Sequence, residues 1–125
     1  MKLVHLPTPE EPDLVVIPTD ESDLYLLSKI IKTGDHIGAK TTRKVAVTQT
    51  QNVRKSMYLN VCVQQLVYQQ TDLEIIITGK VLVGSDDVAA GQMHTLHIGP
   101  MNKITITPKD PLLQTDKEQI IKHCD

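Results

Sequence analysis

Five basic side chains lie in a segment of the chain that contains no carboxylate. The segment from His36 to Thr71 has no Asp or Glu, and it carries Lys40, Arg43, Lys44, Arg54 and Lys55. The whole chain of 125 residues has 13 Lys and Arg against 15 Asp and Glu, so its net charge of −2 hides a segregated distribution. A local cationic surface attracts polyanions whatever the net charge of the protein. These residues therefore indicate the binding of phosphate groups.

The short connection between the two groups of cations adds hydrogen-bonding side chains. Gln49, Gln51 and Asn52 lie in it, and they suit phosphates and 2′-hydroxyl groups, while the cations supply affinity through counterion release. Tyr58 is the only aromatic residue near the connection, so base-specific recognition of single strands is disfavoured. Charge alone leaves open an alternative in which the cations protect an exposed strand edge from pairing with other chains.

Residues that could perform catalysis are scattered. The chain has no Gly-rich phosphate loop, nucleophile elbow or HExxH motif. His94 and His97 are three apart on an expected strand and would face opposite sides, which disfavours a shared metal. The pair Asp86-Asp87 lies in an expected surface loop, Glu21 and Asp23 suit a helix start, and Cys62 has no cationic neighbour in sequence. We therefore expect no enzyme activity, no metal and no cofactor.

Length and composition indicate a single domain with an aliphatic core. The chain has no Phe and no Trp, so Ile, Val and Leu must fill the interior, and β-branched residues favour sheet. No apolar run approaches the roughly 20 residues that cross a bilayer, and the first residues lack a signal-peptide core. Two cysteines do not form a disulfide framework. We expect a cytoplasmic protein that does not bind membranes.

The pattern of apolar residues predicts the elements that position the cations. A helix is expected near residues 21–32, preceded by capping residues and followed by Gly34. Apolar residues that recur every second position then predict strands at 43–47, 57–63 and 73–81, the last with a bend or bulge at Gly79. Two further short strands are expected at 96–98 and 104–106, joined as a hairpin through residues 99–102. A final helix is expected from Asp110-Pro111 or from the capping box that begins at Thr115. Short strands around one early helix indicate a mainly β (α+β) domain, a small and nearly closed barrel.

One run of residues resembles a known family. Gly34, Asp35, Ala39, Thr41, Arg43, Lys44 and Val45 fit the pattern in which a helix ends in Gly-Asp and an Ala-x-Thr-x-Arg-Lys-Val strand follows. This pattern is similar to that of the N-terminal domain of the Pelota family, the ribosome-rescue relatives of the class-one eukaryotic release factor. The opening Met1 to Val4, the step Gly91-x-x-His94-Thr95 and the ending Cys124-Asp125 agree with it. The family's Trp-Asp after the last strand is replaced by Pro108 to Pro111, and the loop at 48–53 is often longer in the family.

The resemblance implies an Sm-like barrel that enters the vacant A site of stalled ribosomes, in no-go decay and ribosome rescue. Carried over to this sequence, the residues that meet ribosomal RNA and mRNA would be Lys40, Arg43, Lys44, Gln49, Gln51, Asn52, Arg54 and Lys55. The resemblance further implies partnership with an elongation-factor-like GTPase, mainly through domains outside this chain. Residues 1–125 would then be the first domain of a longer protein.

Two other functions remain open from the sequence. A metal-dependent RNA endonuclease would need clustered carboxylates, and the basic segment has none, so Asp35, Glu21 or Asp23 would have to fold towards it. A protein-interaction or ring-forming Sm-like module would pair open barrel edges between subunits.

Overall fold

The part of the chain that the structure describes folds into seven strands and two helices. The computed structural model describes residues 1–46, 52–83 and 88–124, and it describes the side chains of these residues except at 43–46 and 52. In chain order the elements are β1 (Lys2–His5), β2 (Leu14–Ile17), α1 (Glu21–Ile30), β3 (His36–Ala46), β4 (Asn52–Gln69), β5 (Glu74–Val81), β6 (Met93–Ile98), β7 (Ile104–Thr107) and α2 (Gln114–His123). The predicted fold class, mainly β with one early and one C-terminal helix, is confirmed.

The strands form one antiparallel sheet in the order β1-β2-β7-β3-β4-β5-β6. The predicted hairpin between residues 96–98 and 104–106 is wrong, because β6 pairs with β5, whereas β7 lies between β2 and β3. The residues from Gly99 to Asn102 do form a turn, but the turn leads into a crossover. Without β7, β2 and β3 would each present unpaired backbone groups beside the core, and buried backbone groups need partners. This long-range requirement decides where β7 lies.

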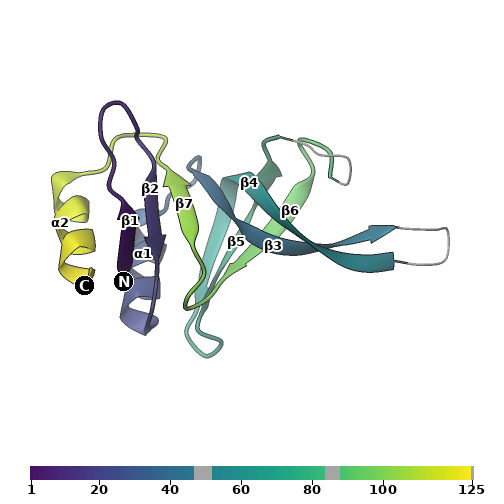
Figure 1. The fold of residues 1–125 in the computed structure, drawn as a ribbon, viewed down its shortest axis with the longest axis horizontal. Coiled ribbons are helices and arrows are strands. Elements are labelled where there is room, and N and C mark those ends of the chain that lie inside the picture. Colours follow the sequence, from purple (N-terminus) through teal and green to yellow (C-terminus); the bar gives the residue numbers. More distant parts are fainter. Residues whose placement is uncertain (47–51, 84–87, 125) are drawn as a thin grey trace.

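The sheet curls so that β6 approaches β3 (Figure 1). Thr41 Oγ1 in β3 lies 2.9 Å from His94 Nε2 in β6, within hydrogen-bond distance. In the part of the chain that the structure describes, β6 forms its ladder with β5 alone. The barrel is therefore nearly closed, with side-chain contacts in place of a final ladder.

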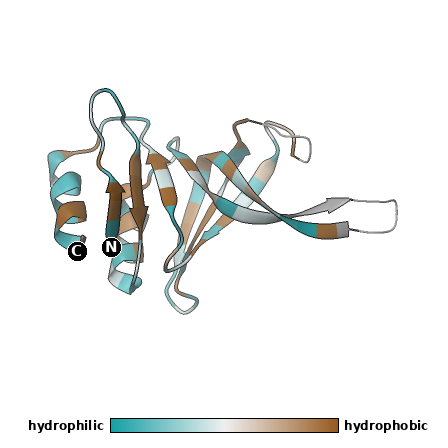
Figure 2. Ribbon diagram, viewed as in Figure 1, coloured by the Kyte–Doolittle hydropathy of each residue, from teal (hydrophilic) through white to brown (hydrophobic). Residues whose placement is uncertain are grey.

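The core is aliphatic, as the composition predicts. Leu59, Val61 and Val63 of β4 are buried in alternation with more exposed neighbours, and the hydropathy of the strands and helices follows the same pattern (Figure 2). Ile75, Ile77 and Val81 continue the core on β5, and Leu24, Leu27 and Ile30 add the inner face of α1. Leu73 does not belong to this row, because it lies in the turn before β5 with φ 51° and is exposed.

A bulge accompanies Gly79, but it lies on the neighbouring strand. The β4–β5 register shifts between Val63 and Gln65, so that Val63 pairs with Gly79 and Gln65 with Thr78. A Cβ atom at Gly79 would overlap the carbonyl oxygen of Cys62. Gly79 is therefore required by a close approach of two backbones.

The two helices begin in different ways. Asp20 caps α1, and its carboxylate accepts a hydrogen bond of 3.0 Å from the Asp23 backbone N–H. The predicted range 21–32 is thus two residues longer than the observed helix, because the chain turns extended at Ile31. Helix α2 begins at Gln114, which lies between the two predicted starts at Asp110-Pro111 and at the capping box of Thr115, and its cap residue Leu113 makes no side-chain capping bond.

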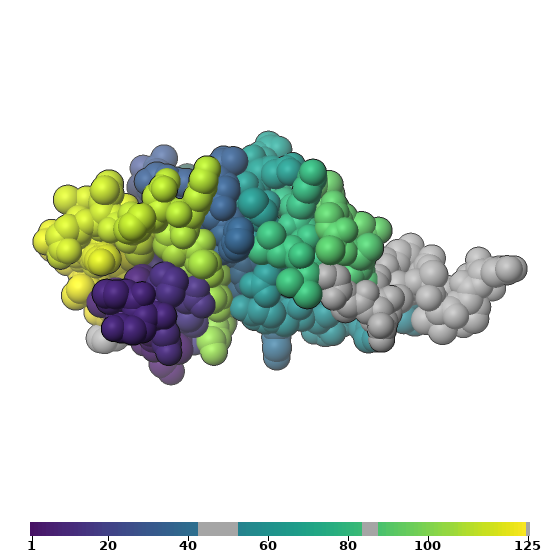
Figure 3. Space-filling view, turned by 90° about the horizontal axis from the view of Figure 1, so that it is seen from above, coloured from purple at the N-terminus to yellow at the C-terminus, as the bar shows by residue number. Residues whose placement is uncertain are grey.

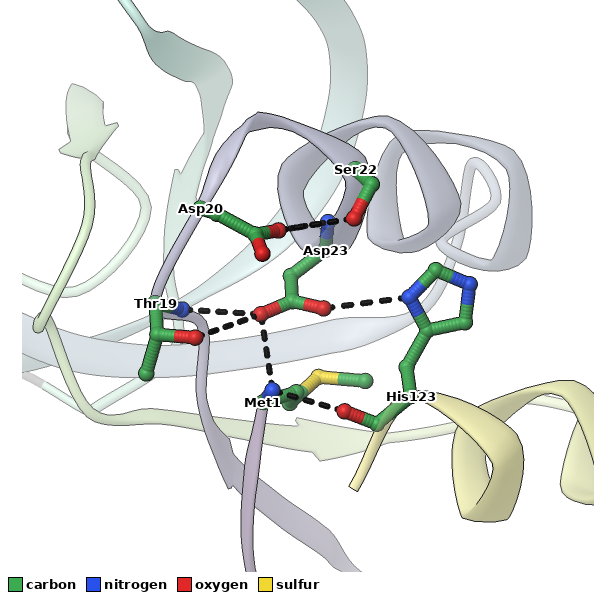
Figure 4. A network of polar contacts seen from close by, with 6 residues as sticks. All are labelled: Met1, Thr19, Asp20, Ser22, Asp23 and His123. Atoms are coloured by element: carbon green, nitrogen blue, oxygen red, sulfur yellow. Dashed lines mark hydrogen bonds and ion pairs between the residues drawn. The ribbon is translucent and has the colours of Figure 1, made fainter. Parts of the chain in front are cut away.

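A buried polar network joins both ends of the chain to α1. The Met1 ammonium lies 2.9 Å from the Asp23 carboxylate and donates to the His123 carbonyl of α2 at 2.7 Å (Figure 4). Thr19 donates to the same carboxylate through its backbone N–H and its hydroxyl, and His123 Nδ1 lies 3.1 Å from the other oxygen. β1 and α2 consequently lie side by side at one end of the molecule (Figures 1 and 3).

Candidate nucleic-acid interface

The outer halves of β3 and β4 form a two-stranded ribbon that projects from the end of the molecule opposite the chain termini (Figure 1). β3 pairs with β7 only over residues 36–39, and β4 pairs with β5 from Val61 onward. Beyond those points the two strands pair only with each other, up to Ala46 opposite Asn52. The side chains of residues 53–56 are exposed. The ribbon is thus accessible from both faces.

Four of the five cations form two adjacent rungs of the ribbon. Arg43 pairs with Lys55, and Lys44 pairs with Arg54. Residues directly opposite in an antiparallel pair share one face, and neighbouring rungs alternate between faces. Each face of the ribbon therefore has one pair of like charges. Such pairs are destabilising when they stand directly opposite, so this arrangement suits a surface that binds a polyanion.

Edge protection explains this pattern less well. The two strands of the ribbon have unpaired outer edges, and charged residues discourage further strand addition there. Opposite charges facing one another would protect the edges equally and would avoid the repulsion. The repeated like-charge pairing favours the phosphate-binding interpretation.

The structure describes the side chains of some predicted site residues, only the backbone pairing of others, and two of them not at all. Lys40, Arg54 and Lys55 are exposed, and Arg54 Nη1 lies 3.5 Å from Thr42 Oγ1 on the opposite strand. Arg43, Lys44 and Asn52 are placed by the register of the ladder. Gln49 and Gln51 lie outside the described residues, as do Asp86 and Asp87. The role of all eight residues in RNA binding stays a prediction.

One cation near the ribbon was missed from the sequence. Lys103 follows the turn between β6 and β7, and it lines a groove of about 660 Å³ together with Lys40 and Tyr58. Its position could not be foreseen from the sequence, because it depends on β7 pairing with β3 beside Lys40.

Two of the acids with possible catalytic roles, Asp35 and Asp23, have structural partners. Asp35 is buried, and its two carboxylate oxygens accept from the backbone N–H groups of Lys32 and Lys109, each at 2.9 Å. Burial raises the pKa of Asp23, but the Met1 ammonium, Thr19 and His123 outweigh it and hold that pKa at about 2. Within the described ranges, no group of three or more His, Cys, Asp and Glu side chains could hold a metal ion.

The histidines on β6 face opposite sides, as predicted. His94 is buried beside Thr41, whereas His97 is exposed and lies 3.1 Å from Glu74.

Among the described residues no helix is long and apolar enough to span a bilayer.

Comparison with known proteins identifies related chains. A model of the Pelota N-terminal domain matches residues 1–124. The chain is 28% identical over 103 residues to the pelota homolog of Methanocaldococcus jannaschii, which covers 78% of this chain and 30% of that protein. It is 33% identical over 95 residues to the pelota homolog of Hyperthermus butylicus, covering 73% and 26% respectively.

Solved structures of this group share the fold. Archaeal Pelota in a ribosome-bound model with ABCE1 matches with a TM-score of 0.79 and 24% identity, over 98% of this chain and 35% of that one. Dom34 of S. cerevisiae matches with a TM-score of 0.77 and 16% identity, over 100% of this chain and 34% of that one. Dom34 is a translation termination-like factor that is involved in RNA quality control pathways and interacts with Hbs1. The chain thus spans about a third of the length of these relatives. Since the family model covers nearly every residue, the chain belongs to the Pelota N-terminal domain family.

Proposed function

We propose that this chain is a non-catalytic RNA- and ribosome-binding domain of a Pelota-like factor, which recognises stalled ribosomes at the vacant A site in no-go decay and ribosome rescue. The observation that carries the proposal is the pair of like-charge rungs, Arg43–Lys55 and Lys44–Arg54, on a ribbon that extends beyond the core. Within the described part of the chain the ribbon itself has no carboxylate, so its own side chains carry positive charge only.

The comparisons support the same setting. One similar structure is ribosome-bound, and another protein of this fold acts in RNA quality control with Hbs1 as a partner. We infer that the domain works in the cytoplasm as the first domain of a longer protein. An elongation-factor-like GTPase would bind mainly through the other domains, which leaves the ribbon available for rRNA and mRNA.

Charge reversal on β4 tests the proposal. Arg54→Glu with Lys55→Glu should weaken binding to ribosomes and to a short single-stranded RNA by about tenfold or more at 0.1 M salt. The slope of log affinity against log salt should fall by about 1 to 2, because each phosphate contact to a single strand contributes roughly 0.7.

A matched double variant controls for overall charge. Lys2 and Lys32 are exposed and lie outside the acid-free segment, so Lys2→Glu with Lys32→Glu changes the net charge equally. This variant should bind like the unaltered chain. Equal binding by both double variants, with both folded by circular dichroism, would remove the basis of the proposal.

The two alternatives predict other results. An endonuclease would cleave a short RNA with Mg²⁺ and would lose that activity in Asp35→Ala, yet both oxygens of Asp35 are already engaged by backbone N–H groups. A ring-forming module would associate through the edge strands β1 and β6, and a mass measurement in solution would then give a multiple of 13.9 kDa.

A further inference from the structure

A groove on the sheet lies where three strands and one connection meet. Its volume is about 660 Å³, and its lining consists of Lys40, Tyr58, Met101, Asn102, Lys103 and Thr105. Lys40 belongs to β3, Tyr58 to β4 and Thr105 to β7, while the other three precede β7. The volume falls within the range of about 300 to 1,000 Å³ that is typical of small-ligand sites.

Tyr58 provides a flat surface in this groove. It pairs with Lys40 across the β3–β4 ladder, and 53% of its surface is exposed. A Cβ atom at Gly38 would overlap the Tyr58 hydroxyl group, so the outer end of this side chain lies against the backbone of β3 at that glycine. More than half of the Tyr58 surface is nevertheless open to solvent, which leaves the ring accessible for stacking. Exposed aromatic rings of this kind stack on nucleobases with little regard to base identity.

Met101 lines the same groove and has a strained backbone conformation. Its φ is 71°, a region that residues other than glycine rarely adopt, and 70% of its surface is exposed. Its backbone N–H donates to the Pro18 carbonyl at 2.7 Å, which holds the turn in place. Strained residues of this type concentrate at ligand sites. A flexible thioether can pack on the edge or face of an aromatic ring.

The charge of the groove selects an anion. Lys40 and Lys103 are both exposed, and the lining contains no Asp or Glu. An aromatic ring beside two ammonium groups matches a nucleotide, which has one planar group and one phosphate. An acidic peptide would satisfy the lysines but would leave the Tyr58 ring without a matching group.

The groove continues the cationic face of the ribbon. Lys40, Thr42 and Lys44 alternate along β3 and therefore lie on the same face, and Arg54 is opposite Lys44. A single strand bound along this face would pass from the rung at Lys44 to the groove at Lys40. Continuity with a surface already proposed to bind RNA favours RNA over a protein partner.

We propose that the groove binds one nucleotide of single-stranded RNA, with its base stacked on Tyr58 and its phosphate between Lys40 and Lys103. The inference rests on the proposed function and adds a stacking site to it. It also explains how a domain with only three tyrosines and no other aromatic residue gains affinity for unpaired RNA without reading its sequence.

Binding of two matched RNA probes tests the stacking site. One probe is an eight-nucleotide oligoadenylate, and the other has the same sugar-phosphate backbone without bases. The unaltered 125-residue chain should bind the base-bearing probe at least about fivefold more tightly, since stacking of one base contributes roughly 1 to 3 kcal/mol. Tyr58→Ala should abolish this preference, whereas Tyr58→Phe should keep it.

Control variants separate stacking from general surface effects. Tyr25 is also 53% exposed but lies on α1, with Lys29 over its ring, so Tyr25→Ala should keep the preference. Lys103→Gln should weaken binding of both probes equally and lower the salt slope by about 0.7. The chain has no tryptophan, so Tyr58→Trp provides a single fluorophore that the base-bearing probe alone should quench.

The outcomes distinguish this site from the proposed function. Equal binding of the two probes by the unaltered chain, or a base preference that survives in Tyr58→Ala, would overturn the stacking site. If Arg54→Glu with Lys55→Glu still weakened binding of the baseless probe, the proposed function would stand even though the stacking site had been ruled out. Failure of the unaltered chain to bind either probe would overturn the stacking site and the RNA-binding part of the proposed function together.

Discussion

The ammonium group of Met1 lies 2.9 Å from the carboxylate of Asp23, and both side chains are at most 2% exposed. Thr19, the His123 carbonyl and the His123 ring make further hydrogen bonds to this pair. Removing one partner of a buried ion pair leaves the other charge uncompensated, which is far more costly than losing a surface pair. The network therefore holds β1, α1 and α2 together at one end of the domain.

Asp23→Asn should lower the free energy of unfolding by about 3 kcal/mol, because the Met1 ammonium would remain buried without its counter-charge. Urea denaturation at pH 7 measures the effect. Asp20→Asn is a suitable control, since asparagine caps helices as well as aspartate does and the change should stay within about 0.5 kcal/mol. A loss in Asp23→Asn no larger than that in the control would show that the ion pair contributes little.

Stability should also depend on acid pH through Asp23. Its folded pKa of about 2 lies below the ordinary value of 3.8, so its stabilising contribution is complete above about pH 4 and is lost as the pH falls from about 4 to 2. The difference corresponds to about 2 kcal/mol. Urea midpoints at pH 5, 4, 3 and 2 should fall more steeply for the unaltered chain than for Asp23→Asn. Parallel curves for the two proteins would contradict the assignment.

Gly79→Ala should destabilise the domain by about 2 kcal/mol, because the added methyl group would meet the Cys62 carbonyl in a packed ladder. Gly99→Ala is the matched control, since its nearest atoms would be 3.6 Å away, an ordinary contact. Thermal melting of the two variants gives the comparison. Equal melting temperatures would mean that β4 can move away from β5 at little cost.

Arg54→Gln should weaken RNA binding without weakening the fold. It removes one of two like charges on the rung with Lys44, so the free energy of unfolding should rise by a few tenths of a kcal/mol at low salt. The gain should vanish at 0.5 M salt, where the repulsion is screened. Lys2→Gln, at an exposed position on β1, should change neither property. A clear loss of stability in Arg54→Gln would instead assign Arg54 a structural role.

Much of the local structure follows from the sequence. The helix from Glu21, the alternating rows on β4 and β5 and the opposite orientations of His94 and His97 all depend on the spacing of neighbouring residues. Period-two and period-3.6 patterns reflect which face of an element is buried, and that information is local. The acid-free segment and its cations are likewise visible without coordinates.

Composition and residue patterns are sufficient to predict a mainly β domain with an aliphatic core and a segregated cationic segment. How these parts meet depends on tertiary contacts. Strand pairing between distant segments places β7 between β2 and β3, whereas β6, which precedes it in the chain, pairs with β5. That pairing brings Lys103 to Lys40, and the β3–β4 register places Arg43 opposite Lys55. The Met1–Asp23–His123 network likewise joins residues from both ends of the chain. Such contacts depend on which strand edges and charged groups lack partners once the core is packed. The spacing of neighbouring residues in the sequence does not predict these long-range partners.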